Sequence, residues 1–426
     1  MIHAVVFDTD APFRAGDAPA SDVSAEDRLA GLTLLRRMIL MAREAGAASA
    51  TVVAHDPESA RRWRSSEVAL PIPVTVVEPN ELLLLPDECD GVLVLSAQVL
   101  PQASLLDRLV DEFRAGRSVA AVASGAASGG PAVVHADDLR ERSAAGESPT
   151  HAVEQLVRVA GPTVVDPRSY RHLIDQEAVA AADRDMYRGM TSASDGFVDR
   201  VFSRHVSRWF TRRIVNLPIT PNQITWFHLA LGLGAAGLFW RGGYVSGLFG
   251  AVLLQLSVAL DCSDGEVARL KFQTSRFGSQ LDVAADNIIN VAVFAAIAKA
   301  AAGRLGSRLA LTLGALSVIG VAMCVLVVLL MVRVQGRLRP GEASSLAVTN
   351  RLSFNDPVAP ATTATMVDTV INEVTSRDFT VLIVALAIIN HLEWFAWLAG
   401  IGSHVFWVSF GAVQLSMLRS ASAKLS

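Results

Sequence analysis

The chain has 426 residues, with 37 basic and 41 acidic side chains and a formal net charge of −4. A hydrophobic fraction of 51% against 18% charged residues is high for a soluble protein, and the long apolar runs begin near Asn222. The charge balance excludes a global basic field for nucleic acid, and three widely separated cysteines give no disulfide framework.

The front of the chain, residues 1–169, alternates strand-like and helix-like stretches. Short apolar runs predict strands, and stretches with helical periodicity predict helices. The predicted strands are Ala4–Phe7, Ala50–Ala54, Val74–Val77 and Gly91–Leu95, and the predicted helices are Leu29–Gly46 and Ser104–Ala115. This alternation predicts an α/β domain with a mainly parallel, Rossmann-type sheet.

Residues 170–217 are predicted to form a polar linker that ends in an amphipathic juxtamembrane helix. Over Val198–Val215, apolar side chains such as Trp209 and Phe210 share one side, and arginines populate the rest. A basic amphipathic helix just before apolar stretches is typical of a segment that lies on a membrane surface. An ordinary solvated helix is the alternative.

Residues 218–426 contain six apolar stretches, which predict an all-α bundle of six transmembrane helices. The stretches are Gln223–Phe239, Tyr244–Asp261, Asp286–Ala302, Leu309–Val332, Phe379–His391 and Phe395–Leu415. Lys and Arg residues lie mostly on one side of these stretches, which predicts that the chain termini face the cytoplasm. The N-terminus lacks the features of a signal peptide, so we expect the front domain to lie in the cytoplasm.

Four aspartates gather around the loop between the second and third apolar stretches. Asp261 and Asp264 are three residues apart, and Asp282 and Asp286 are four apart, so each pair shares a helix face. Both pairs lie where an apolar stretch is predicted to meet the cytoplasm. Solvated loop acids are the alternative, but four carboxylates at paired helical spacings beside membrane segments favour a functional site.

Carboxylates this close together repel one another unless a cation lies between them. Oxygen ligands suit Mg²⁺ or Mn²⁺ rather than Zn²⁺, and two such ions can bind a pyrophosphate and stabilise its leaving oxygen. Gly265 and Ala268 let a ligand approach the helix, and Gly278 relieves crowding near the second pair. Arg269 adds a fixed positive charge for phosphate.

The same segment resembles a known family at every fixed position of its signature. The matching residues are Asp261, Asp264, Gly265, Ala268, Arg269, Gly278, Asp282 and Asp286. This is the signature of the CDP-alcohol phosphotransferase family. The segments Asp195–Arg200 and Ile219–Thr225 are also similar to those that precede and open the first span of that family, so the resemblance covers about Asp195 to Arg419.

The resemblance implies an enzyme that moves a substituted phosphate group from a CDP-alcohol to an acceptor alcohol and releases CMP. The four aspartates would bind two ions, Mg²⁺ or Mn²⁺, and Asp286 would also be the general base for the acceptor hydroxyl. Gly265, Ala268 and Arg269 would line the CDP site with Gly278 nearby, and Asn222 and Thr225 would lie near the nucleotide phosphates. The family also implies a homodimer.

The identity of the two alcohols is left open by the sequence. The donor is a CDP-lipid or a CDP-polyol, and a phosphorylated polyol is one possible acceptor. Arg333, Arg337 and Arg339 suit an anionic acceptor, or they are simple positive-inside flanking residues. The alternative function is a non-catalytic membrane scaffold whose front domain binds a nucleotide or a partner.

The front domain resembles sugar-nucleotidyltransferase domains, which some archaeal enzymes of inositol phosphate metabolism fuse to a CDP-alcohol phosphotransferase. Two segments depart from that pattern. Asp8 and the residues after it replace a Gly-rich phosphate loop, and Ser96-Ala97-Gln98 stands where a metal-binding aspartate is expected. We therefore expect a domain that keeps the fold and has lost cytidylyltransferase activity.

Overall fold

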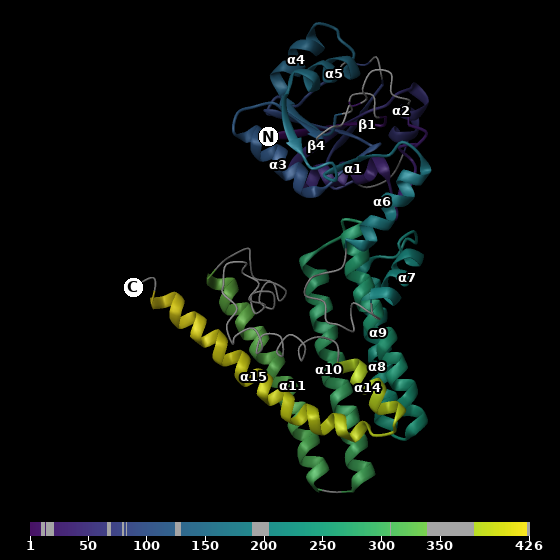
Figure 1. The fold of residues 1–426 in the computed structure, drawn as a ribbon, viewed down its shortest axis with the longest axis vertical. Helices are drawn as coiled ribbons and strands as arrows, with labels where there is room; N and C mark the ends of the chain where they lie inside the picture. The colour runs from purple at the N-terminus through teal and green to yellow at the C-terminus, as the bar shows by residue number, and fades with distance from the viewer. Residues whose placement is uncertain are drawn as a thin grey trace. The chain divides into compact units, whose positions relative to one another are not determined.

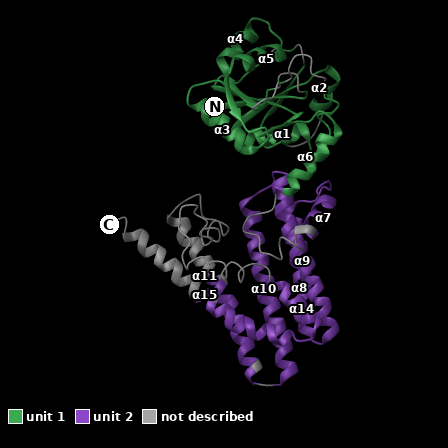
Figure 2. Ribbon diagram, in the orientation of Figure 1, with its two compact units in different colours: residues 1–188 green, residues 189–426 purple. Residues whose placement is uncertain are grey.

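The computed structural model describes residues 1–9, 13, 21–65, 70–78, 81, 83–123, 129–189, 204–306, 308–338 and 379–423. Its internal contacts divide the chain into two compact units, residues 1–188 and residues 189–426 (Figure 2). Unit 1 continues past residue 169, because strand β11 (Tyr170–His172) pairs with β7 (Val99–Pro101) and helix α6 (Gln176–Arg188) contacts β2 (Arg28–Leu29).

Unit 1 is built on a seven-stranded sheet in the order β10-β8-β9-β6-β1-β4-β5. Figure 1 labels its strands β1 and β4. The strands are β1 (Ile2–Phe7), β4 (Ala47–Val53), β5 (Val74–Val77), β6 (Gly91–Ser96), β8 (Val119–Ala123), β9 (Ala132–His135) and β10 (Gly161–Val165). Within it, only β9 pairs antiparallel with its neighbours. Every residue of β1 and β6 is buried, which explains their mainly apolar sequences. The predicted α/β class is confirmed.

Unit 1 also contains six helices among its described residues. They are α1 (Leu34–Glu44), α2 (Pro57–Arg64), α3 (Ala103–Arg114), α4 (Ala136–Ala144), α5 (Pro149–Val159) and α6. The predicted start of the first helix at Leu29 is wrong, because β2 and β3 (Leu32–Thr33) form a tight hairpin there. Ala30 and Gly31 turn the chain with φ of 46° and 85°, and the Thr33 hydroxyl then caps α1.

Unit 2 is helical throughout its described residues. Its helices are α7 (Arg204–Ile214), α8 (Pro221–Arg241), α9 (Tyr244–Leu270), α10 (Arg276–Leu305), α11 (Arg308–Leu338), α14 (Phe379–Ile388) and α15 (Leu392–Ala423). Each of the six predicted apolar stretches coincides with one of the helices α8 to α15. Helix α8 contacts both α9 and α10, and its first turn is closed by a capping box between Thr220 and Gln223.

Two helices of the described part, α9 and α10, are long and apolar enough to cross a membrane. Leu311–Cys324 within α11 and the whole of α14 are shorter apolar helices. Helices α8, α9, α10, α14 and α15 share one apolar core, in which Phe239, Ile289 and Phe395 are buried. The helical class of this unit is confirmed, and the number of membrane crossings stays a prediction.

Helix α7 packs on α9 through both apolar and small polar residues, and its Phe210 and Ile214 lie against a cluster that contains Leu260 and Val267 of α9. Ser207 and Thr211 are fully buried, and the Thr211 hydroxyl donates to the Glu266 carboxylate at 2.7 Å. Trp209 is 56% exposed and lies under the Arg213 guanidinium. Residues 190–203, which carry the start of the predicted amphipathic helix and the Asp195–Arg200 segment, lie outside the described residues.

Candidate metal centre

The four predicted aspartates converge where α9 and α10 face each other. Asp261 and Asp264 lie on α9, and Asp282 and Asp286 lie on α10. Two overlapping groups each have ligand atoms within 4.8 Å of one another: Asp261, Asp264 and Asp282 form one, and His228, Asp261 and Asp286 form the other. Asp261 belongs to both, so the structure keeps the α9 pair together and brings Asp282 and Asp286 of α10 to it in separate groups.

The α9 carboxylates of this site are buried. Asp261 is 4% exposed and Asp264 is 5% exposed, whereas the Asp286 side chain is 36% exposed. Burying several carboxylates in one place is costly unless positive charge compensates them. The side chains present, mainly carboxylates at mutual distances that one ion can bridge, therefore fit the divalent ions that the sequence predicts.

Thr225 connects α8 to this cluster by a hydrogen bond. Its hydroxyl donates to Oδ2 of Asp264 at 2.5 Å and lies 3.1 Å from the Pro221 carbonyl oxygen of its own helix. Helix α8 begins at Pro221 after the Thr220–Gln223 capping box, so Thr225 lies in its second turn. The Thr225 side chain therefore contacts one carboxylate of the aspartate cluster.

Asn222 and Gly278 meet at the N-terminal ends of α8 and α10. A Cβ on Gly278 would lie 3.0 Å from Oδ1 of Asn222 and 3.0 Å from the Ser275 hydroxyl, so the residue must be small. The Ser275 hydroxyl accepts from the Gly278 backbone N–H at 2.9 Å and caps α10. The closely packed first turn of α10, which contains Gly278, therefore lies one turn before Asp282.

Gly265, Ala268 and Arg269 continue α9 beyond the aspartates. The Arg269 guanidinium lies over Gly265, at 3.6 Å from where a Cβ would stand, and Arg269 itself is exposed. Gly265 and Ala268 are partly exposed. These three residues leave an open, positively charged helix surface beside the buried Asp264.

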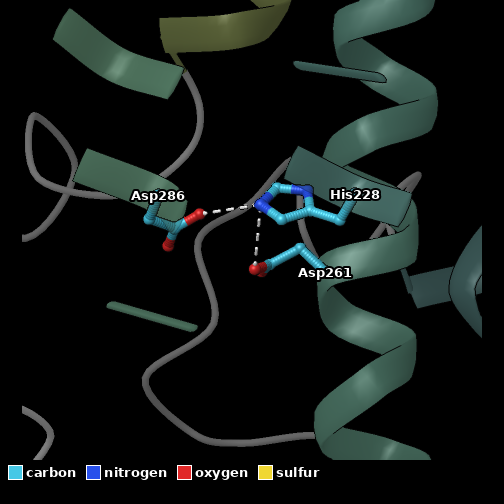
Figure 3. Close-up of side chains that lie close together, drawn as sticks. All are labelled: His228, Asp261 and Asp286. Atoms are coloured by element: carbon cyan, nitrogen blue, oxygen red, sulfur yellow. Dashed lines mark ion pairs between the residues drawn. The ribbon is translucent and has the colours of Figure 1, made fainter. Parts of the chain in front are cut away.

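His228 is a site residue that the sequence reasoning missed. It lies on α8, one turn after Thr225, and is 2% exposed. Its Nε2 atom is 3.6 Å from Oδ1 of Asp261 and 3.4 Å from Oδ1 of Asp286, between the two carboxylates (Figure 3). The signal was an ionisable side chain inside an apolar stretch, which by itself indicates a functional position.

The carboxyl ends of the central strands of unit 1 hold the residues that depart from the nucleotidyltransferase pattern. Asp8 follows β1 and accepts from Nδ1 of His55 at 2.7 Å and from the His55 backbone N–H at 3.1 Å. Burial raises the pKa of the Asp8 carboxyl, against the opposing effect of those hydrogen bonds. The Ser96 hydroxyl donates to the Thr9 carbonyl at 2.7 Å, and the Gln98 amide donates to the Val23 carbonyl. These side chains make internal structural contacts.

Comparison with known proteins points to one family for the helical unit. Residues 218–405 match the family model of CDP-alcohol phosphatidyltransferases. A bifunctional IPC transferase and DIPP synthase of Aquifex aeolicus is 38% identical over 104 residues, which are 24% of this chain and 23% of that protein. A phosphatidylinositol phosphate synthase of Corynebacterium glutamicum is 38% identical over 84 residues, which are 20% of this chain and 37% of that protein.

The chain thus spans well under half the length of either curated relative. Among solved structures, the 4-diphosphocytidyl-2C-methyl-D-erythritol synthase of Anaerococcus prevotii is similar at 11% identity and a TM-score of 0.33, over 43% of this chain and 97% of that one. The matched range of the family model contains all four aspartates, His228 and Thr225. Residues 218–405 are therefore similar in sequence to the CDP-alcohol phosphatidyltransferase family.

Proposed function

We propose that this chain is an integral membrane transferase that moves a substituted phosphate group from a CDP-alcohol to an acceptor alcohol and releases CMP. One observation carries the proposal. Four aspartates from α9 and α10 converge in two overlapping groups with ligand atoms within 4.8 Å, inside the residues that match the family. No other part of the described chain combines buried carboxylates, a family match and an open basic helix surface.

The reaction follows from the proposed roles of these residues. The acceptor hydroxyl gives its proton to Asp286, which is the more exposed carboxylate of its group. The acceptor oxygen bonds to the β-phosphorus of the donor as the bond from that phosphorus to the CMP oxygen breaks. Two bound ions, Mg²⁺ or Mn²⁺, would supply positive charge for the pyrophosphate and for the leaving CMP. The exposed Arg269 would hold a phosphate oxygen.

The proposed substrates follow the names of the relatives. The Corynebacterium relative is named a phosphatidylinositol phosphate synthase. We propose a CDP-lipid or CDP-polyol donor and a phosphorylated polyol acceptor. Arg333 and Arg337, whose side chains lie outside the described part, and Arg339, which lies wholly outside it, remain candidates for acceptor binding.

The family is membrane-integral, and α9 and α10 have the length and composition to cross a bilayer. We propose that unit 1 and the aspartate site face the cytoplasm and that the chain acts as a homodimer. We also propose that unit 1 has no cytidylyltransferase activity, because Asp8, Ser96 and Gln98 replace the expected phosphate and metal ligands and are bonded internally.

The test is CMP release by the purified full chain in detergent, with CDP-diacylglycerol or a CDP-polyol, an acceptor and Mg²⁺ or Mn²⁺. We expect CMP only when donor, acceptor and metal are all present. Asp286→Asn should lower the rate by at least about a hundredfold, the lower end of general-base contributions. Asp137→Asn, an exposed acid on α4, is the matched control and should leave the rate unchanged. A non-catalytic scaffold would release no CMP with any of these donors.

A further inference from the structure

His228 adds an imidazole nitrogen to a site that otherwise holds carboxylates. It comes from α8, whereas Asp261 and Asp286 come from α9 and α10, so the three residues join three helices (Figure 3). The Nε2 atom is buried and makes no hydrogen bond to any residue that the structure describes. A buried ring nitrogen directed at two carboxylates requires an explanation, because such polar atoms are normally bonded.

The other ring nitrogen determines the tautomer. Nδ1 of His228 lies 2.9 Å from the Ser257 carbonyl oxygen, which can only accept, so Nδ1 carries the hydrogen. The Ser257 hydroxyl is also 2.9 Å from Nδ1 and donates to the His228 carbonyl oxygen at 2.9 Å, which leaves that hydroxyl as a second acceptor for Nδ1. In the neutral ring the lone pair is therefore on Nε2 and faces the carboxylates.

This is how proteins hold a metal-binding histidine. A histidine that binds a metal through one nitrogen usually donates the other N–H to a backbone carbonyl or a carboxylate, which fixes the ring orientation. Ser257 of α9 supplies that support here. Without a metal ion, a neutral ring would direct its lone pair at two carboxylate oxygens, which is unfavourable, and only a protonated ring would pair with them.

Both Nε2–oxygen distances are longer than a hydrogen bond, and the shorter one reaches the range expected for two ligands of one ion. Nε2 is 3.4 Å from the Asp286 oxygen and 3.6 Å from the Asp261 oxygen. A charge-assisted N–H···O bond is about 2.8 Å long. Two neighbouring ligands of one ion, each bonded at about 2.1 Å, lie roughly 3.0–3.4 Å apart.

We infer that Nε2 of His228 is a metal ligand and that, with Asp261 and Asp286, it holds one of the two ions of the site. The inference rests on the proposed function in that it takes the aspartates as metal ligands. An imidazole ligand favours Mn²⁺ and other first-row transition ions over Mg²⁺. The two ion positions then differ, since the group of Asp261, Asp264 and Asp282 offers oxygen ligands alone.

Pulsed electron paramagnetic resonance of the Mn²⁺-loaded full chain tests this directly. A nitrogen bonded to Mn²⁺ modulates the electron spin echo at ¹⁴N frequencies. We expect this modulation in the wild-type protein and its replacement by a ¹⁵N pattern when the protein is made with ring-¹⁵N histidine, a comparison that needs no variant. His228→Gln should lose the modulation and weaken Mn²⁺ binding by at least about tenfold, with a smaller effect on Mg²⁺.

His391→Gln is the matched control, because His391 lies at the start of α15, bonded to Glu393 and stacked on Trp394. It should keep the modulation. Absence of Mn²⁺ binding, absence of nitrogen modulation in the wild-type protein, or modulation that persists in a folded His228→Gln protein would each overturn the inference.

CMP release measured on the same samples separates the two proposals. Nitrogen modulation without CMP release would leave the histidine ligand in place and reject the proposed transfer. CMP release without nitrogen modulation would reject the ligand and keep the transfer.

Discussion

At the scale of single residues, the contact between Thr225 and Asp264 joins α8 to the aspartate cluster. The Thr225 hydroxyl is 2.5 Å from the buried Asp264 carboxylate. Thr225→Val keeps the shape of the side chain and removes the donor, which costs about 1–3 kcal/mol when the acceptor stays buried. We expect a lower thermal midpoint and weaker Mn²⁺ binding in detergent.

Thr312→Val is the control for that change, because the exposed Thr312 hydroxyl bonds, among the described residues, to the Leu309 carbonyl of its own helix at 2.9 Å. It should have little effect. Equal losses in both variants would show that Thr225 has no special role at the cluster.

His3 gives a residue-scale prediction for unit 1. It is buried on β1 between the Ser49 and Thr51 hydroxyls, and burial lowers its pKa to about 4. The unfolded chain takes up a proton with a pKa of about 6.5, so the free energy of unfolding is highest above that pH and falls as the pH drops towards 4. The loss can reach about 3 kcal/mol.

Urea-dependent proteolysis of unit 1 within the full chain, at pH 7.5 and pH 5, measures this difference. His3→Gln should flatten the pH dependence, whereas His151→Gln, an exposed site on α5, should not. If the free energy of unfolding of the His3→Gln protein depended on pH as strongly as that of the wild type, His3 would not be the source of the pH dependence.

The four aspartates could be predicted as site residues from the sequence, whereas the role of His228 could not. Helical spacing places Asp261 and Asp264 on one face, and a specific motif supports all four acids. Spacing within a helix says nothing about which carboxylates meet across two helices. The grouping of Asp282 with the α9 pair, and of Asp286 with His228, depends on the packing of α8 against α9 and α10.

At the scale of helices, close packing of α8 on α10 holds His228 opposite Asp286. A Cβ on Gly232 would lie 2.4–2.9 Å from three Ile289 side-chain atoms, whereas a Cβ on Gly237 would meet nothing within 4 Å. Gly232→Ala should therefore separate the helices, cost about 1–3 kcal/mol and weaken Mn²⁺ binding. Gly237→Ala should be neutral or up to about 1 kcal/mol more stable.

Thermal unfolding and Mn²⁺ titration of both variants in detergent compare the same chemical change at two positions. A Gly232→Ala protein with wild-type metal affinity would mean that the distance between α8 and α10 does not control the site.

Apolar runs in the sequence predicted where the helices and strands lie more reliably than they predicted where these elements begin and end. The strands β1, β4, β5 and β6 lie where short apolar runs predict them. Every residue of β1 and β6 is buried, whereas β4 and β5 include exposed residues. The start of α1 was missed because a two-residue turn at Ala30 and Gly31, with positive φ at both, interrupts a helical pattern. The part that Ser207 and Thr211 play in the buried face of α7 was missed, because these residues are polar and lie beside the apolar Phe210 and Ile214.

At the scale of the whole molecule, we propose that unit 2 carries out all catalysis and that unit 1 carries out none. The full chain should therefore release no pyrophosphate from CTP with inositol phosphate or any sugar phosphate, because Asp8 and Ser96 stand where phosphate and metal ligands would be needed. A coupled pyrophosphate assay on the full chain checks this. Pyrophosphate release that is proportional to protein and lost in Asp8→Asn would show a working second enzyme.

The proposed transfer is tested most directly by following the donor β-phosphorus. A CDP-alcohol labelled at that phosphorus is incubated with the full chain, metal and acceptor, and the label is located in the products. Transfer predicts one labelled phosphodiester for each CMP released, and almost none of either with Asp286→Asn. Label that stays in a monoester, or CMP release that does not depend on the acceptor, would contradict transfer to an alcohol.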